Sequence, residues 1–91
     1  MDNEEAKKLL AQELKKYRQK SYTELQVLLN AQDTYAVTGK SGAEYQIEIQ
    51  VFWDDQKDGN LRVVGAVDDG GLRSFMPLTD GFILTPEGKF F

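Results

Sequence analysis

The chain has 91 residues, a hydrophobic fraction of 41% and a net charge of −4 at pH 7, which indicates one folded domain over residues 1–91 and excludes a disordered chain. It contains no cysteine and no histidine, which excludes disulfides, thiolate metal sites and histidine-based catalysis. No apolar run approaches the roughly 18 residues of a membrane span, and the charged N-terminus lacks the apolar core of a signal peptide. We expect a cytoplasmic protein without a cofactor.

The charge is unevenly distributed along the chain. Residues 1–20 hold six basic and four acidic residues, whereas residues 21–91 hold five basic and eleven acidic ones. An acidic body argues against phosphate-driven binding to nucleic acid. The basic N-terminal segment leaves one alternative open, which is nucleic-acid contact through Lys8, Lys15, Lys16 and Arg18.

The first segment has the pattern of an amphipathic helix. Acidic residues lie near its start and basic residues near its end, an order that suits the helix dipole. One stripe has helical spacing and consists of Ala6, Leu10, Leu14 and Tyr17, with Leu9 at its edge. The stripe predicts a helix packed on its own domain; the alternative is a helix that binds a membrane or a partner.

A second, shorter helix is predicted at 22–30. Ser21 and Glu24 have the spacing of a capping box, and an apolar face follows at Tyr22, Leu25, Leu28 and Leu29. Residues 1–30 are therefore expected to be helical.

From residue 33 on, apolar residues recur at every second position instead of at helical spacing. This pattern predicts that residues 33–91 form a sheet. We expect strands at 33–39, 43–53 and 61–68, with turn residues at 40–42. The second strand has the clearest alternation, and its buried face is expected to hold Tyr45, Ile47, Ile49, Val51 and Trp53.

Asp69-Gly70 favours a tight hairpin, because a type I′ turn needs positive φ at both central residues. This turn pairs strand 61–68 with the residues that follow it. The predicted pairs on the buried face are Val67 with Leu72, Gly65 with Ser74 and Val63 with Met76; on the other face they are Val64 with Phe75 and Ala66 with Arg73.

The last residues are predicted to form a connection and a small hairpin. Pro77 ends the preceding strand, residues 77–81 connect, and 82–91 form a hairpin around the turn from Thr85 to Gly88. The order of elements predicts an α+β fold, with two N-terminal helices packed on an antiparallel meander sheet of four to five strands.

The segment WDDQKDGN, residues 53–60, has the composition of a metal loop. The EF-hand pattern nevertheless fails, because it would place Gln56 at position three, Lys57 at position four and Gly65 at position twelve. We therefore predict a polar hairpin connection. An alternative function is binding of a divalent metal or small ligand by loop carboxylates, with the candidates Asp54, Asp58, Asp68 and Asp69, although a meander separates the two loops by roughly 20 Å.

No catalytic motif is recognised. Gly39-Lys40-Ser41 resembles the end of a P-loop, but the earlier glycine is replaced by Thr34 and a strand follows where a helix is needed. The serines have no histidine to activate them. The sequence therefore predicts a protein that is not an enzyme.

One face of the predicted sheet has the composition of an interface centre. It combines aromatic residues with arginines, at Phe52, Arg62, Val64, Arg73 and Phe75. If the face is open, it predicts binding to a protein partner or to a second copy. The alternative is that a helix or Phe90-Phe91 covers it.

The run from Tyr45 to Phe91 resembles small bacterial proteins of uncharacterised families. The resemblance rests on Trp53-Asp54-Asp55, Leu61-Arg62-Val63, Asp68 to Gly71, Pro77-Leu78 and Pro86 to Gly88. It covers about half of the chain and implies a bacterial origin and a fold, but no activity.

Overall fold

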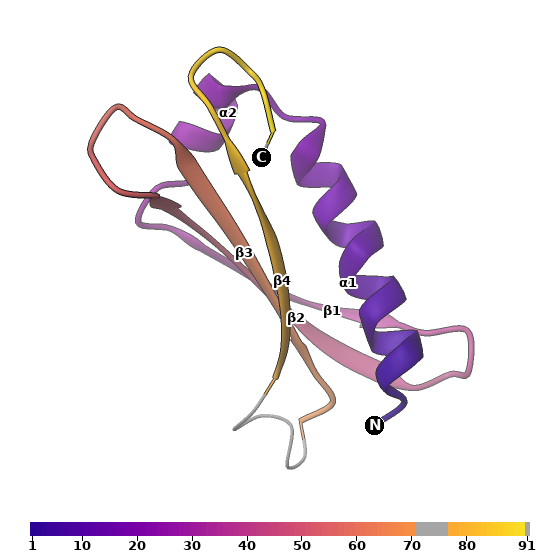
Figure 1. The fold of residues 1–91 in the computed structure, drawn as a ribbon. Helices are drawn as coiled ribbons and strands as arrows, with labels where there is room; N and C mark the ends of the chain where they lie inside the picture. Colours follow the sequence, from indigo (N-terminus) through magenta and orange to yellow (C-terminus); the bar gives the residue numbers. More distant parts are fainter. Residues whose placement is uncertain (71–76, 91) are drawn as a thin grey trace.

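A computed structural model describes residues 1–70 and 77–90. The elements in chain order are α1 (Asn3–Arg18), α2 (Tyr22–Gln26), β1 (Gln32–Thr38), β2 (Glu44–Trp53), β3 (Leu61–Asp68) and β4 (Leu78–Leu84). The strands form one antiparallel sheet in the order β1-β2-β3-β4, and α1 lies along one of its faces (Figure 1). The predicted α+β meander is confirmed in the described residues, which form one long helix, one short helix and four strands.

Helix α1 forms where the sequence predicts it. The Asp2 carboxylate accepts a hydrogen bond from the Glu5 backbone N–H at 3.1 Å and so caps the first turn. The predicted stripe is buried, namely Ala6, Leu10, Leu14 and Tyr17. A charged residue, Glu13, is buried beside it, and the sequence did not predict this.

Helix α2 begins with the predicted capping box but is shorter than predicted. Ser21 and Glu24 each accept a hydrogen bond from the other's backbone N–H. The helix ends at Gln26 rather than at residue 30, because the chain must turn into the sheet: Leu29 bridges Val51 of β2 and Asn30 has a φ of 63°. Leu25 remains in the core.

Strands β1, β2 and β3 lie within one residue of their predicted bounds. Along β2, Tyr45, Ile47, Ile49 and Val51 are buried, whereas Trp53 is only partly buried. In β3 the buried residues alternate in the same way, and Ile47 pairs with Val67 and Val51 with Val63. The buried face of the sheet therefore faces α1.

The partner of β3 differs from the prediction. Val67 pairs with Leu78, Val63 with Phe82 and Val64 with Gly81, so the predicted pairs of β3 with Leu72, Arg73, Ser74, Phe75 and Met76 are wrong. Those five residues lie outside the described part of the chain. The observed register buries Phe82 and Leu84 beneath the helices, and large apolar side chains gain more from burial than a two-residue turn contributes.

The C-terminal turn forms as predicted, but no fifth strand follows it in the described residues. The Thr85 N–H donates to the Lys89 carbonyl at 2.8 Å, and the Gly88 N–H donates to the Thr85 carbonyl at 2.9 Å. Beyond the turn, Phe90 makes a single bridge to Leu84. Residues 78–81, predicted as a connection, belong instead to β4.

The core lies between α1 and the sheet. Gly65 permits the helix to approach β3 closely, because a Cβ at this position would lie 2.8 Å from Leu10 Cδ1 and 3.1 Å from Leu14 Cδ2. In the described residues, neither helix has the length and apolar composition needed to cross a membrane.

Candidate functional site

The candidate site is the outer face of the sheet, defined as the face opposite α1. One row of paired residues crosses β2, β3 and β4 on this face and consists of Phe52, Arg62 and Ile83. Val64 lies in the next row. Phe52 is 45% exposed, Arg62 is exposed, and Val64 and Ile83 are half-buried. None of the described outer-face residues is buried, so this apolar cluster faces outward.

A depression of about 370 Å³ lies beside this cluster. Its lining includes Val64, Gly81 and Ile83. Gly81 pairs with Val64 on the outer face and has no side chain, so the surface is lower here than at its neighbours. The cluster and the depression together offer an apolar side chain of a partner a place to insert.

Arg62 is held in place by Asp54. The Arg62 Nε and Nη2 atoms each lie 2.8 Å from Asp54 Oδ1. An exposed ion pair of this kind contributes about 0–1 kcal/mol to stability. Its effect here is to orient the guanidinium beside Phe52, its neighbour in the ladder.

The other end of the outer face is acidic. Glu44, Glu48 and Asp68 lie on it, and Gln46 pairs with Asp68. Gln32 of β1 donates a hydrogen bond to Glu48. The face therefore has an apolar end with one arginine and an acidic end, a pattern that favours a partner with complementary charge.

Three of the five predicted partner-binding residues are brought together by the structure. These are Phe52, Arg62 and Val64; Arg73 and Phe75 lie outside the described residues. The sequence reasoning missed Gly81 and Ile83. The short apolar run of Phe82, Ile83 and Leu84 is the signal that could have identified Ile83, because such a run indicates a strand that is buried on one face or both.

In the described residues, neither a helix nor Phe90 covers the outer face. Helix α1 packs on the opposite face. The Phe90 ring makes an edge-to-face contact with Phe82, with centroids 5.6 Å apart, and Phe82 belongs to the buried face. Phe90 therefore lies on the helix side of the sheet, and Phe91 lies outside the described residues.

The loop carboxylates do not gather into one site. Asp54 is at one end of the β2–β3 hairpin and Asp68 at the other, as the meander predicted. The β2–β3 loop is closed by the Asp54 N–H, which donates to the Asn60 carbonyl at 2.8 Å, and by the Tyr22 hydroxyl, which donates to the Gly59 carbonyl at 2.6 Å. Within residues 1–70 and 77–90, no three acidic groups are placed to hold a metal ion.

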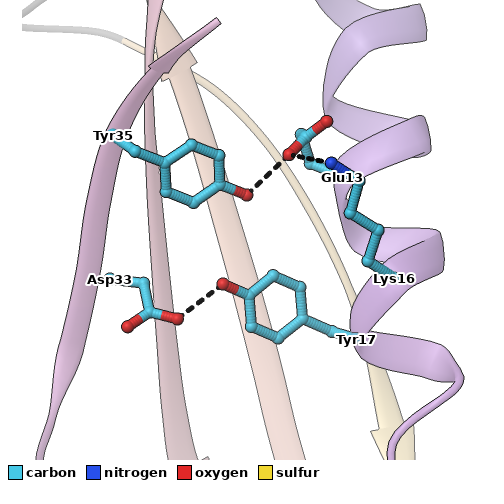
Figure 2. A network of polar contacts seen from close by, with 5 residues as sticks. All are labelled: Glu13, Lys16, Tyr17, Asp33 and Tyr35. Atoms are coloured by element: carbon cyan, nitrogen blue, oxygen red, sulfur yellow. Dashed lines mark hydrogen bonds and ion pairs between the residues drawn. The ribbon is translucent and has the colours of Figure 1, made fainter.

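A polar network joins α1 to β1, as Figure 2 shows. The Tyr35 hydroxyl donates to Glu13 Oε1 at 2.8 Å, and Lys16 Nζ lies 3.1 Å from the same oxygen. The Tyr17 hydroxyl donates to Asp33 Oδ2 at 2.6 Å. Because the Glu13 side chain is only 8% exposed, these bonds satisfy a carboxylate that would otherwise be costly to bury.

A second polar cluster fastens the start of α1 to the β1–β2 hairpin. Glu5 accepts hydrogen bonds from the Ser41 hydroxyl at 2.6 Å, the Ser41 N–H at 3.0 Å and the Tyr45 hydroxyl at 2.8 Å. The bonds from Ser41, and then that from Tyr45, hold the pKa of Glu5 below its usual value. Both clusters therefore fix the position of the helix on the sheet.

All four tyrosines are expected to resist ionisation while the protein is folded. The bond to Glu5 and then burial raise the pKa of Tyr45 to about 12, and burial and then Glu13 raise the pKa of Tyr35 to about 12. Burial is also the main cause of the raised pKa of Tyr17 and of Tyr22. Since these groups favour the protonated form when folded, their stabilising contribution is complete below pH 10 and is lost as the pH rises toward 12.

The measurement is tyrosinate absorbance against pH, recorded beside circular dichroism. We expect little ionisation near pH 10 and a cooperative rise that coincides with unfolding. A non-cooperative titration of two or more tyrosines near pH 10, with the fold intact, would contradict this expectation.

Comparison with known protein families, with curated proteins and with solved structures finds no match to this chain.

Proposed function

We propose that this protein is a non-catalytic interaction domain that binds another protein through the outer face of its sheet. The observation that carries the proposal is a row that the described part of the chain leaves uncovered, namely Phe52, Arg62 and Ile83, beside the depression at Gly81. An exposed aromatic side chain, an oriented arginine and a cavity for an apolar group are features of interface centres. On the sequence alone, we place the protein in the bacterial cytoplasm.

The alternative function of metal binding has less support. Asp54 is engaged by Arg62, and Asp68 lies at the far end of the same hairpin. No single site among the described residues uses the predicted carboxylates together, so the outer face is the better candidate.

The proposal is tested with a matched pair of charge substitutions. Phe52→Glu places a charge in the proposed interface, and Val27→Glu places the same charge at a residue of α2's C-terminal end that is 78% exposed. Val27→Glu is expected to change stability by less than about 0.5 kcal/mol. Phe52→Glu also loses the packing of a ring that is 45% exposed, so circular dichroism checks that this variant is folded. We expect Phe52→Glu to weaken partner binding about thirtyfold, the effect of losing about 2 kcal/mol at an interface centre.

The binding partner is captured from a lysate of the source organism with the native protein and both variants as bait. Sedimentation of the purified native protein in parallel detects a partner that is a second copy. Loss of the partner with Phe52→Glu and its retention with Val27→Glu support the proposal. Equal capture by all three baits would place the interface elsewhere.

A further inference from the structure

Among the residues that the structure describes, the free edge of β4 has no strand partner over most of its length. On one side β4 pairs with β3 from Leu78 to Leu84. On the other side, the described residues supply one pairing, the bridge between Leu84 and Phe90. The stretch 78–83 is therefore an uncovered edge in the described chain, and such an edge is a template for another strand.

The C-terminal turn indicates which backbone groups of β4 point toward this edge. The Thr85 N–H donates away from β3, to Lys89. Since backbone groups alternate along a strand, Thr79, Gly81 and Ile83 also direct their N–H and C=O groups to the edge. The Gly81 N–H donates instead to the carboxylate of its neighbour Asp80, at 2.8 Å. Asp80 thus satisfies one donor that an added strand would otherwise bind.

A groove lies between this edge and α1. It has a volume of about 460 Å³. Its apolar lining residues are Leu10, Ala11 and Leu78, and its polar ones are Lys7, Lys8, Thr79 and Asp80. A strand added at the edge of β4 would direct every second side chain toward α1, because successive side chains alternate between the faces of a sheet. The groove is therefore placed to receive those side chains.

The flank of α1 above the edge has an excess of basic residues, although it also holds Glu4, three residues before Lys7 and four before Lys8. Lys7 and Lys8 border the groove, and the Arg18 guanidinium carbon lies 4.6 Å from the centroid of the Phe82 ring. Lys15 falls on the same flank, four residues after Ala11 and three before Arg18. In the described residues, Lys7, Lys8 and Lys15 are exposed and take part in no ion pair. This flank has the charge to attract acidic groups.

The same charge disfavours a second copy at this edge. The groove places Lys7 beside Leu78 and Asp80, and the cation–π contact places Arg18 beside Phe82, so α1 runs in the same direction as β4. Antiparallel pairing of two β4 edges would bring the two basic helix flanks together, and like charges repel. Asp80 adds protection, because a charged residue on the inward side of an edge strand hinders self-pairing.

We propose that the edge of β4, with the groove beneath α1, binds an extended acidic segment of another protein by strand addition. The segment becomes the fifth strand of the sheet, its inward apolar side chains enter the groove, and its acidic groups contact Lys7, Lys8 and Lys15. In the free protein the Asp80 carboxylate accepts the hydrogen bond of the Gly81 N–H. When the segment binds, the Asp80 side chain rotates away and the N–H bonds to the segment. This surface adjoins the outer face at Gly81 and Ile83, which belong to both. It uses their edge-directed backbone groups, however, and does not depend on the function proposed for the outer face.

The probe is a capped nonapeptide with alternating valine and threonine in its centre and two glutamates at each end. The control peptide has lysines in place of the glutamates. Binding is followed by amide chemical shifts of the isotope-labelled full chain at low and high salt. We expect the acidic peptide to shift residues 78–83 and the basic flank of α1, with an affinity that falls as salt rises.

Two variants separate strand addition from simple charge attraction. Thr79→Pro removes one outward N–H at a position where an edge strand tolerates proline, and should weaken the acidic peptide about tenfold, whereas Thr79→Ala should bind normally. The charge-reversed variant Lys7→Glu/Lys8→Glu/Lys15→Glu leaves the edge intact and should invert the preference between the two peptides. The second variant keeps the test decisive if Thr79→Pro does not fold.

Several results would overturn the proposal. These are equal binding of both peptides, unchanged binding by Thr79→Pro with its fold intact, and an absence of shifts at residues 78–83 at millimolar peptide. A dimer that Thr79→Pro disperses would assign the edge to a second copy. If a short single-stranded DNA binds more tightly than the acidic peptide, and Thr79→Pro does not change its affinity, the basic flank is a nucleic-acid site.

Discussion

Replacing Gly81 by alanine is expected to destabilise the protein by about 3 kcal/mol, the upper part of the range for overpacked sites. A Cβ at this position would lie 2.3 Å from the Val63 carbonyl oxygen and 3.4 Å from Val64 Cα. These are backbone atoms of the neighbouring strand, so the clash cannot be relieved by rotating a side chain. Strand β4 would have to move away from β3, and the burial of Phe82 and Leu84 would be impaired.

The effect of Gly81→Ala is measured by denaturant unfolding beside Thr79→Ala. Thr79 is exposed on the same strand, so its replacement reports the cost of altering strand propensity alone, at most about 1 kcal/mol. We expect a much lower unfolding midpoint for Gly81→Ala than for Thr79→Ala. Equal midpoints would show that β4 pairs with β3 less closely than the structure indicates.

Replacing Leu10 by alanine is expected to cost about 2–5 kcal/mol, the usual effect of removing a buried leucine side chain. Leu10 is 2% exposed and lies over Gly65 of β3. In the native protein, Gly65→Ala should also destabilise, since its new methyl group would meet Leu10 Cδ1 at 2.8 Å and the tip of Ile49 at 3.1 Å. The two positions therefore compete for the same space.

The double variant Leu10→Ala/Gly65→Ala tests this competition. Once the Leu10 side chain is removed, the closest contact of the methyl group at residue 65 is lost, and only those with Ile49 and Leu14 at 3.1 Å remain. Gly65→Ala should therefore be less destabilising in that background than in the native protein. The double-mutant cycle should give a coupling energy of about 1–3 kcal/mol, as for residues in direct contact. Additive free energies of unfolding would show that α1 does not rest on β3 at this point.

Several elements could be predicted because their signals are local. The stripe of Ala6, Leu10, Leu14 and Tyr17 has the period of a helix, and the capping box of Ser21 and Glu24 lies within one turn. The strict alternation along β2 predicted which of its faces is buried. In each case, neighbouring residues alone determine the backbone geometry, so no information from distant parts of the chain is needed.

The candidate site was predicted only in part, because its members come from three strands. Phe52 and Arg62 could be placed on the same face, since the alternation along each strand puts both of them opposite the buried row. Ile83 and Gly81 could not, because the predicted hairpin at Asp69-Gly70 assigned the place beside β3 to other residues. In the structure, residues 78–84 take that place beside β3, and the chemistry of the turn residues does not encode this choice.

The sequence by itself therefore determined the helical and strand periods, the helix caps, the C-terminal turn and the absence of histidine and cysteine chemistry. The tertiary structure decided which strand pairs with β3, where α2 ends and that Glu13 is buried with Tyr35 as its partner. The reason is physical. Helical and strand periods depend on residues a few positions apart, whereas strand pairing depends on which distant side chains gain most from burial, here Phe82 and Leu84 beneath the helices.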